Sequence, residues 1–295
     1  MRMKTVMLRR TAATVGLITL LWIMSTLMIP SSSHAAIFFD SDFETCITGT
    51  GDDFPCEGWD DFGQEAVGHE EAVSGFSFSG NKSMKHTFDR KEAVTPATAG
   101  NTKKPSIYHA LPDMTHMFLR VTVRHSPGFQ ICDNGGTKMI RFRGTAGYPI
   151  LWLMNQRNVY ALIMEAPGDY PGTYVISTTA VPSQTSWDQV EVEYKLNTPG
   201  QSDGLVRIWV NGVLRGEQLN KAYIGPTPTS KCGNGSNMCP STLSYQTVQV
   251  YAQCGLGTVH YDRIAVGNTR IGPTSSKSTS VDSTPPASPQ GFRAY

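Results

Sequence analysis

The chain has 295 residues, with 25 Lys and Arg against 24 Asp and Glu, and a formal net charge of +1 at pH 7. Four of the basic residues lie in the first ten positions, so removing that segment leaves 21 basic against 24 acidic side chains, or about −3. This balance excludes a typical nucleic-acid binder. The length suits one all-β domain with its own core.

Residues 1–36 predict an export signal. The basic residues precede an apolar run at about 11–29, which ends in proline and small side chains. This is the pattern of a secretory signal peptide, with cleavage expected after Ala35 or Ala36. An uncleaved anchor is the alternative, because the run is long enough to span a bilayer. No other segment of the sequence is long and apolar enough to span a bilayer. We therefore expect a secreted, periplasmic or cell-surface protein without membrane contact once the signal is cleaved.

All the cysteines follow the signal, where the compartment permits disulfides. They are Cys46, Cys56, Cys132, Cys232, Cys239 and Cys254. The short spacings favour the first with the second and the fourth with the fifth, which leaves the third and sixth as a long-range pair. Other connectivities stay open. A zinc site of four cysteines is a rival, although the sequence has no CxxC pair.

Short alternating or β-branched runs recur along the mature chain. They lie at residues 37–44, 82–88, 117–125, 138–143, 150–155, 159–165, 173–178, 189–196, 205–210, 247–254 and 259–266. Turn residues separate them, and none carries a helical period. This predicts a two-sheet antiparallel jelly-roll β-sandwich over residues 37–273. Residues 274–295 are rich in Ser, Thr and Pro and predict a flexible tail.

One late run has an unusual polar face. Val248 and Val250 share the apolar face, while the other face carries Tyr245, Thr247, Gln249, Tyr251 and Gln253. Tyr rings can stack on sugars, and Gln amides both donate and accept hydrogen bonds. We therefore interpret Tyr245, Gln249 and Gln253 as ligand-binding residues, with Tyr251 available for proton transfer.

Two earlier runs place arginines on sheet faces. Arg120 and Arg124 alternate with inward apolar residues, and Arg141 and Arg143 alternate likewise with Ile140 and Phe142. Met139 is expected on the arginine side. If these faces share one hollow with the Tyr/Gln run, they form a cationic trough. The planar guanidinium suits carboxylate or sulfate, so the trough predicts an acidic polysaccharide as partner. An ordinary solvated sheet face is the alternative.

Two further groups carry other hypotheses. Glu191 and Glu193 share a strand face, as the carboxylates of a retaining glycosidase could, but a solvated convex face is the simpler interpretation. Acidic residues crowd the front of the chain, and Asp42 together with Asp262 on the last run could hold a structural calcium ion if the first and last strands are neighbours. Solvated loop charge is the alternative. Among the histidines, His109 follows Tyr108, whose hydroxyl could join proton transfer.

Three segments resemble the concanavalin A-like lectin/glucanase superfamily, including its laminin G-like and polysaccharide lyase members. Residues 187–192 and 204–214 are similar to its hairpin with an Asn-Gly turn, and residues 260–266 to its closing strand. The resemblance implies a jelly roll. Lectins, lyases and hydrolases share these segments, so the resemblance implies fold more than activity.

The alginate and glucuronan lyases of this fold use a Gln and a His two apart on one strand, an Arg on a neighbouring strand and a Tyr on another. Here Gln130-Ile131-Cys132 stands where Gln-Ile-His is expected, which removes the usual base partner. The segment with Tyr251 and Gln253 is similar to the lyase tyrosine strand. The resemblance then implies that Arg141 and Gln253 neutralise a uronate carboxylate while Tyr251 or His109 moves the proton, with no cofactor required.

Three functions follow from these patterns. The first is an exported protein that engages an acidic polysaccharide and cleaves it by β-elimination. The second is a non-catalytic carbohydrate-binding or cell-surface module that uses the same groove. The third is a glycoside hydrolase built on Glu191 and Glu193.

Overall fold

The computed structural model describes residues 36–47, 56, 58–61, 70–90, 106–133, 135–144, 150–165, 174–223, 245–251 and 254–275. The segment predicted as an export signal, the predicted tail beyond residue 275, Gln253 and the cysteines at 232 and 239 lie outside these residues. No helix that could cross a membrane occurs among the residues described.

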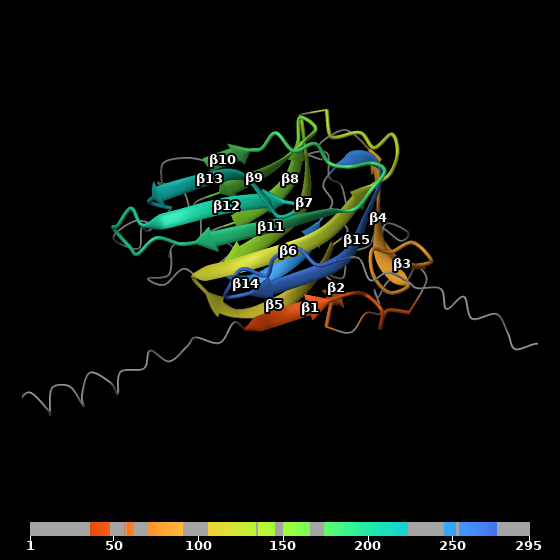
Figure 1. Ribbon diagram of the computed structural model, residues 1–295, viewed down its shortest axis with the longest axis horizontal. Coiled ribbons are helices and arrows are strands. Elements are labelled where there is room, and N and C mark those ends of the chain that lie inside the picture. The colour runs from red at the N-terminus through yellow and green to blue at the C-terminus, as the bar shows by residue number, and fades with distance from the viewer. Residues whose placement is uncertain are drawn as a thin grey trace, which may run out of the picture. The chain divides into compact units, whose positions relative to one another are not determined.

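The described strands form two antiparallel sheets, the layers of a β-sandwich (Figure 1). The first, sheet A, runs in the order β13 (Val213–Lys221), β12 (Gly204–Val210), β11 (Asp188–Lys195), β6 (His116–His125), β15 (Gly255–Gly267), β4 (Lys82–Arg90) and β3 (Glu70–Ser74), with β1 (Ile37–Ser41) also on β15. The second, sheet B, runs in the order β10 (Tyr174–Ser177), β9 (Val159–Glu165), β8 (Ile150–Gln156), β7 (Gly136–Gly144), β14 (Tyr245–Tyr251), β5 (Ser106–Met114) and β2 (Asp60–Asp61). The predicted all-β jelly-roll sandwich is confirmed.

The core lies between the sheets and follows the predicted alternation. Val121 and Val123 of β6 are fully buried, and so are Val248 and Val250 of β14 on the facing sheet. Side chains two apart on a strand share a face, so each strand gives one row to the core and one to the outer face of its sheet. The outer faces are therefore where polar function can lie.

One predicted orientation is wrong. Met139 was expected beside the arginines of β7, but it is fully buried in the core. The pairing of β7 with β8 shifts register between Lys138 and Ile140, which is the mark of a β-bulge. The extra residue of a bulge reverses the alternation on one side of it, so Met139 turns inward while Arg141 keeps its outward place.

Four strands escaped prediction: β2, β3, β5 and β13. The first is only two residues long. Strand β13 carries Gly216, Gln218 and Asn220 among exposed apolar residues, so its sequence lacks the alternation of a half-buried strand. The segment of β5 contains Pro112, which lowers the strand signal.

Two of the predicted disulfides are confirmed. Cys46 is bonded to Cys56, and Cys132 to Cys254. The second bond ties the connection after β6 to the start of β15, where Gln130 and Leu256 also exchange backbone hydrogen bonds of 2.9 Å. These links hold the Gln130-Ile131-Cys132 segment against β15, outside the strands of sheet B.

Candidate functional site

A polar row crosses the outer face of sheet B. Tyr108 of β5 is the register partner of position 249 on β14, and position 249 is in turn the partner of Arg141 on β7. Beyond Arg141 the row continues to Trp152 of β8 and Ile163 of β9. Register partners on adjacent strands stand about 5 Å apart on the same face. The row therefore brings a phenol and a guanidinium to one surface.

Trp152 supports two cations in this row. The Nζ atom of Lys138 lies 3.9 Å from the centroid of the indole ring, and the guanidinium carbon of Arg141 lies 5.3 Å from it. Trp152 itself is buried and packs with Met154 and Ile163 in a hydrophobic cluster separate from the main core. Cation–π attraction holds both charges over one rigid ring. Lys138 was not expected at the site, because the β-bulge between Lys138 and Ile140 changes the face on which its side chain lies.

Arg143 lies on the same face, two residues from Arg141, and is the register partner of position 247. Position 251 is two residues beyond position 249 on β14 and pairs with Ser106 of β5. Position 245 pairs with Gly144 at the other end of β14. Strands β7 and β14 are thus neighbours, as the trough hypothesis requires of them. The structure does not describe the side chains of Tyr245, Gln249 and Tyr251.

His109 does not join this face. Its register partner is Val248, a core residue, and its ring stacks on Phe39 of β1 with centroids 3.9 Å apart. The Nδ1 atom is in hydrogen-bond contact with the carbonyl oxygen of Gly58. Adjacent strand residues point to opposite faces, so the outward Tyr108 forces His109 toward the core side. The prediction that His109 and Arg141 act together in proton transfer on one face is therefore wrong.

Arg120 and Arg124 do not join it either. Both belong to β6, which lies between β11 and β15 in sheet A, whereas β7 and β14 lie in sheet B. Their outward side chains project from the opposite side of the sandwich. The expectation of one hollow lined by all three strands is therefore wrong, because β6 and β7, although consecutive in the chain, enter different sheets.

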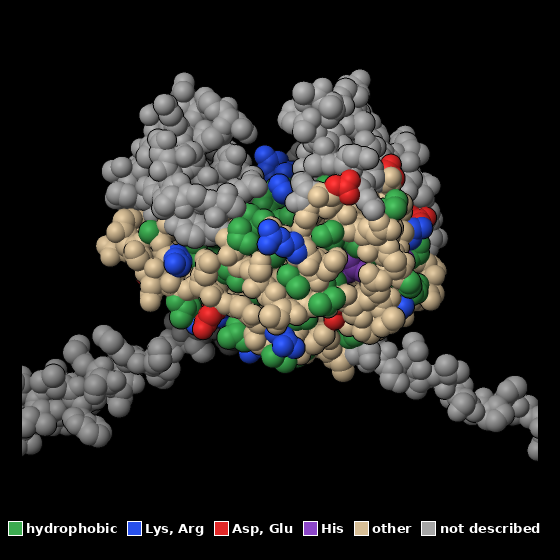
Figure 2. Space-filling model, turned by 90° about the horizontal axis from the view of Figure 1, so that it is seen from above, with side chains coloured by type: hydrophobic (Ala, Val, Ile, Leu, Met, Phe, Trp, Pro, Cys, Tyr) green, Lys and Arg blue, Asp and Glu red, His purple; other side chains and the backbone are tan. Residues whose placement is uncertain are grey.

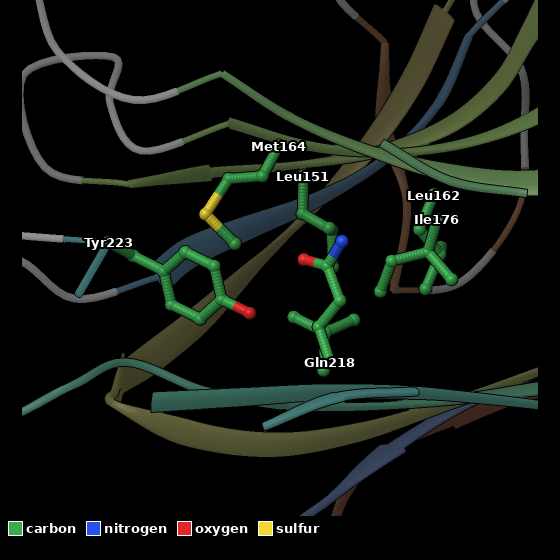
Figure 3. Close-up of a pocket in the computed structure, with 7 residues that line it drawn as sticks. Leu151, Leu162, Met164, Ile176, Gln218 and Tyr223 are labelled. Carbon is green, nitrogen blue, oxygen red and sulfur yellow. The ribbon is translucent and has the colours of Figure 1, made fainter. Parts of the chain in front are cut away.

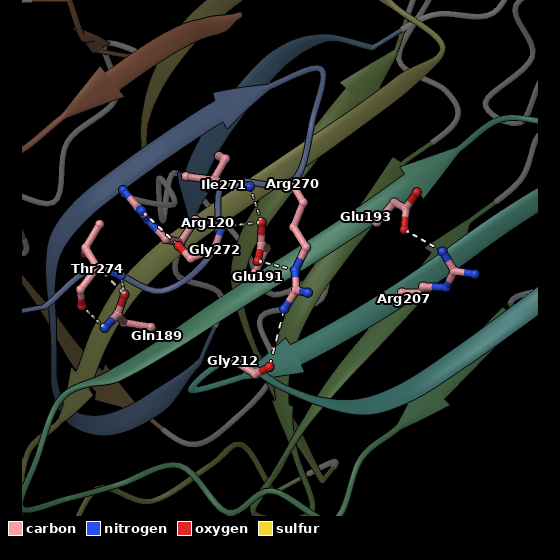
Figure 4. A network of polar contacts seen from close by, with 10 residues as sticks. All are labelled: Arg120, Gln189, Glu191, Glu193, Arg207, Gly212, Arg270, Ile271, Gly272 and Thr274. Atoms are coloured by element: carbon pink, nitrogen blue, oxygen red, sulfur yellow. Dashed lines mark hydrogen bonds and ion pairs between the residues drawn. The ribbon is translucent and has the colours of Figure 1, made fainter. Parts of the chain in front are cut away.

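Arg120 sits beneath a segment of the chain's own C-terminal part, residues 270–274 (Figure 4). Its guanidinium donates to the carbonyl oxygen of Gly272 at 3.1 Å, and it is 2% exposed. Burial is the largest cause that lowers its pKa. Gln189 binds the same segment by donating to the carbonyl oxygen of Thr274 and accepting from its N–H, both at 2.7 Å. Arg120 thus helps to hold residues 270–274 against sheet A.

The two glutamates of β11 are similarly occupied. The Oε1 atom of Glu191 accepts the N–H groups of Ile271 at 2.6 Å and Gly272 at 3.1 Å. Glu193 pairs with Arg207 at 3.0 Å and with His116 at 3.0 Å. Figure 4 shows the carboxylate of Glu191 turned to residues 271 and 272 and that of Glu193 turned to Arg207. The two glutamates hold the fold together here, and the hydrolase hypothesis gains no support.

The calcium hypothesis requires that the first and last strands be neighbours, and β1 does pair with β15. Asp262 is fully buried and accepts hydrogen bonds from the N–H groups of Phe78 and Ser79, while Asp42 is exposed and accepts from the N–H of Glu44. Burial raises the pKa of Asp262 to about 6. Within the described part of the chain, no three acidic, His or Cys side chains gather as a metal site would require. Calcium stays an untested prediction.

A small cavity lies between the sheets at the β10 and β13 end (Figure 3). Leu151, Leu162, Met164 and Ile176 line it together with Gln218, whose Oε1 atom is buried without a hydrogen-bond partner. Its volume of about 10 Å³ is near that of one water molecule. The cavity is too small for a sugar, so the candidate site remains on the outer face of sheet B.

Figure 2 shows both kinds of charged side chain, Lys and Arg as well as Asp and Glu, scattered among hydrophobic and uncharged ones. On the outer face of sheet B, Lys138, Arg141 and Arg143 are each partly exposed, so the row can attract anions.

The fold and these faces define the chain as an all-β jelly-roll sandwich with a cationic outer face. No protein-family model matches the chain, and no curated protein matches it in sequence. Among solved structures, an endo-β-1,4-glucuronan lyase from the fungus Trichoderma reesei matches with a TM-score of 0.53 at 18% identity, over 79% of this chain and 96% of that one.

A mutant of the alginate lyase Aly36B in complex with alginate trisaccharide matches with a TM-score of 0.51 at 14% identity, over 79% of this chain and 98% of that one. Another mutant of that enzyme, in complex with alginate tetrasaccharide, gives a TM-score of 0.50 at 15% identity, over 79% and 97%. At such identities the likeness shows a shared fold.

Proposed function

We propose that this protein is exported, binds an acidic polysaccharide along the outer face of sheet B and cleaves it by β-elimination. The observation that carries the proposal is the register row from Tyr108 through position 249 to Arg141, with Lys138 and Arg141 over Trp152. Fold neighbours that are glucuronan and alginate lyases support it. Two disulfides support export, and membership of the concanavalin A-like superfamily is part of the same proposal.

The chemistry requires a cation, a base and an acid. In β-elimination a base removes the proton from the ring carbon beside the carboxylate, the electron pair forms a carbon–carbon double bond, and the neighbouring glycosidic oxygen leaves with a proton from an acid. Arg141 neutralises the carboxylate and so makes that ring proton more acidic. Lys138 and Arg143 hold carboxylates of adjacent sugar units.

The proton carriers that this face offers are tyrosines. Tyr108 is partly exposed and lies two strands from Arg141, about 10 Å across the sheet, which is about the length of two sugar units. Tyr251, on the strand between them, is the second candidate. One phenol that gives up and returns the proton completes the cycle without a metal or cofactor. Gln249 and Gln253 are proposed to bind sugar hydroxyls beside them.

The test is to incubate the purified protein with alginate, glucuronan and a neutral glucan and to follow ultraviolet absorbance from the new double bond. The proposal expects growth with at least one acidic chain and none with the glucan. Arg141→Gln should lower turnover by at least about a hundredfold, because one charge-assisted contact in the transition state is lost. Arg215→Gln, which removes an exposed charge on sheet A, is the matched control. Unchanged turnover in Arg141→Gln would refute this assignment.

A non-catalytic carbohydrate-binding module is the second candidate. The favouring observation is that His109 packs inward and Cys132 is in a disulfide, so the described strands of sheet B direct no histidine to the outer face. This candidate expects retention of acidic chains on the protein, weakened by Arg141→Gln, with neither absorbance growth nor new reducing ends.

A further inference from the structure

A second cationic and aromatic cluster lies on sheet A, on the opposite side of the sandwich from Arg141. In register, His260 of β15 is flanked by Lys85 of β4 and by Arg124 of β6. Trp187 directly precedes Asp188, the partner of Val123, so it reaches the same row beside Arg124. The row therefore crosses four adjacent strands or their ends.

Phe76, from the loop between β3 and β4, folds onto this row. Its ring centroid lies 4.4 Å from that of His260 and 5.6 Å from that of Trp187. The guanidinium carbon of Arg124 lies 4.7 Å from the same ring. We call Phe76, Arg124, Trp187 and His260 the Arg124 cluster. All four side chains are partly exposed, so a ligand can reach them.

The charges of the Arg124 cluster are not balanced. Lys85 pairs with Glu71, but Arg124 has no carboxylate partner among the described residues. The Nε atom of Arg124 and the Nδ1 atom of His260 are buried and form no hydrogen bond there. Burial is the main cause that lowers the pKa of His260 to about 4, and the nearby positive charges of Lys85 and Arg124 lower it further.

These features ask for a specific kind of ligand. The guanidinium of Arg124 is partly exposed and has no carboxylate partner among the described residues, so it is suited to donate two N–H groups to a carboxylate in a bidentate pair. The aromatic rings beside them offer apolar contact to the C–H face of a sugar. A carboxylate next to an apolar ring face describes a uronic acid residue.

We propose that the Arg124 cluster is a second, non-catalytic binding site for a uronate residue of an acidic polysaccharide. The choice of polymer rests on the proposed function of sheet B, but the site is independent of that sheet. Because the two sites project from opposite faces, one protein binds two chains, or two distant parts of one chain. Binding at the second site raises the effective concentration of polymer at the first.

The test uses a short alginate or glucuronan tetramer and isothermal titration calorimetry on the full chain. In the Arg141→Gln background, which weakens binding on sheet B, the Arg124 cluster should remain as the tighter tetramer site. Adding Arg124→Gln should weaken that site roughly tenfold or more, since a hydrogen bond to a charged group is lost. Arg215→Gln in the same background is the matched control and should leave the affinity unchanged.

An NMR measurement on the unmutated protein tests the second site without relying on variants that could misfold. In the unmutated protein, the NMR signals of the His260 ring should shift as tetramer is added, and a neutral tetrasaccharide should cause no shift. Unshifted His260 signals at saturating tetramer would overturn the second site, whether or not sheet B cleaves. Equal binding of an acidic peptide such as oligoglutamate would overturn the assignment to uronate. If the unmutated protein shows the His260 shift but does not cleave any acidic chain, the second site stands and only the proposed function is contradicted.

Discussion

Replacement of Glu191 tests whether the outer face of sheet A is structural. Glu191 is 3% exposed, and its carboxylate accepts two backbone N–H groups from residues 271 and 272. It also lies beside Arg120, its register partner on β6, which is 2% exposed. Glu191→Ala removes the acceptor for both N–H groups and one of the two nearby carboxylates, with Asp40, that favour the charged form of buried Arg120.

The expected loss of stability is large. A buried N–H group that loses its acceptor costs about 1–3 kcal/mol, and Glu191→Ala leaves two such groups, so the expected cost is about 2–6 kcal/mol. For a domain of this size each kcal/mol lowers the melting temperature by about 2–4 °C, so Glu191→Ala should lower it by roughly 4–24 °C. Glu191→Gln keeps an acceptor oxygen of the same shape and loses only the charge, so its loss should be smaller.

The assay is thermal and urea unfolding followed by circular dichroism. Glu217→Ala is the control, since Glu217 is 43% exposed and pairs with Arg207 at the surface, where such pairs contribute up to about 1 kcal/mol. A loss in Glu191→Ala no greater than in Glu217→Ala would refute a structural role. Folded Glu191→Ala without glycan turnover, where the unmutated protein has it, would return Glu191 to the list of catalytic candidates.

Four further outcomes are expected. The raised folded-state pKa of Asp262 means that its contribution to stability is full below about pH 4 and is lost as the pH rises through about 6, so Asp262→Asn should remove that part of the urea-midpoint profile. Burial lowers the pKa of His125 to about 3, so its contribution is present above about pH 6.5 and declines as the pH falls, a decline that His125→Gln should flatten in the same profile. Loss of the Cys132–Cys254 disulfide in a double serine variant should cost about 2–5 kcal/mol in urea unfolding, because the bond closes a loop of 122 residues. Trp152→Leu should weaken binding of acidic chains more than Trp152→Phe, which keeps a ring beneath the cations; equal affinities by calorimetry would contradict the cation–π argument.

Much of the fold was predictable because a half-buried strand alternates apolar and polar residues in its sequence. The runs around Val121, Val192 and Val248 alternate apolar and polar residues, and each forms a strand with the predicted side inward. The two described disulfides were also predictable from spacing. Alternation fails where a bulge inserts a residue, as at Met139, and where an edge strand exposes both sides, as in β13.

The site was predictable only in part, because alternation gives the face of a strand but not its sheet. Nothing local distinguishes the arginines of β6 from those of β7. The assignment depends on which strands pair, and pairing joins segments far apart in the sequence, such as Arg141 with position 249. Lys138 escaped notice because the β-bulge beside it hides its face, and with it the contact to Trp152 on the neighbouring strand β8.

The contrast between Arg120 and Arg141 shows how the same residue type on the same kind of strand reaches opposite roles. Arg120 lies beneath residues 270–274, so its guanidinium is desolvated and donates a hydrogen bond to a backbone carbonyl. Arg141 is partly exposed and lies over the ring of Trp152, where cation–π attraction holds the guanidinium in place. A guanidinium that binds a ligand needs both a fixed position and access to solvent. Among the arginines compared, Arg141 over Trp152 and Arg124 over Phe76 meet both conditions and Arg120 does not, which is why the two binding proposals rest on Arg141 and Arg124.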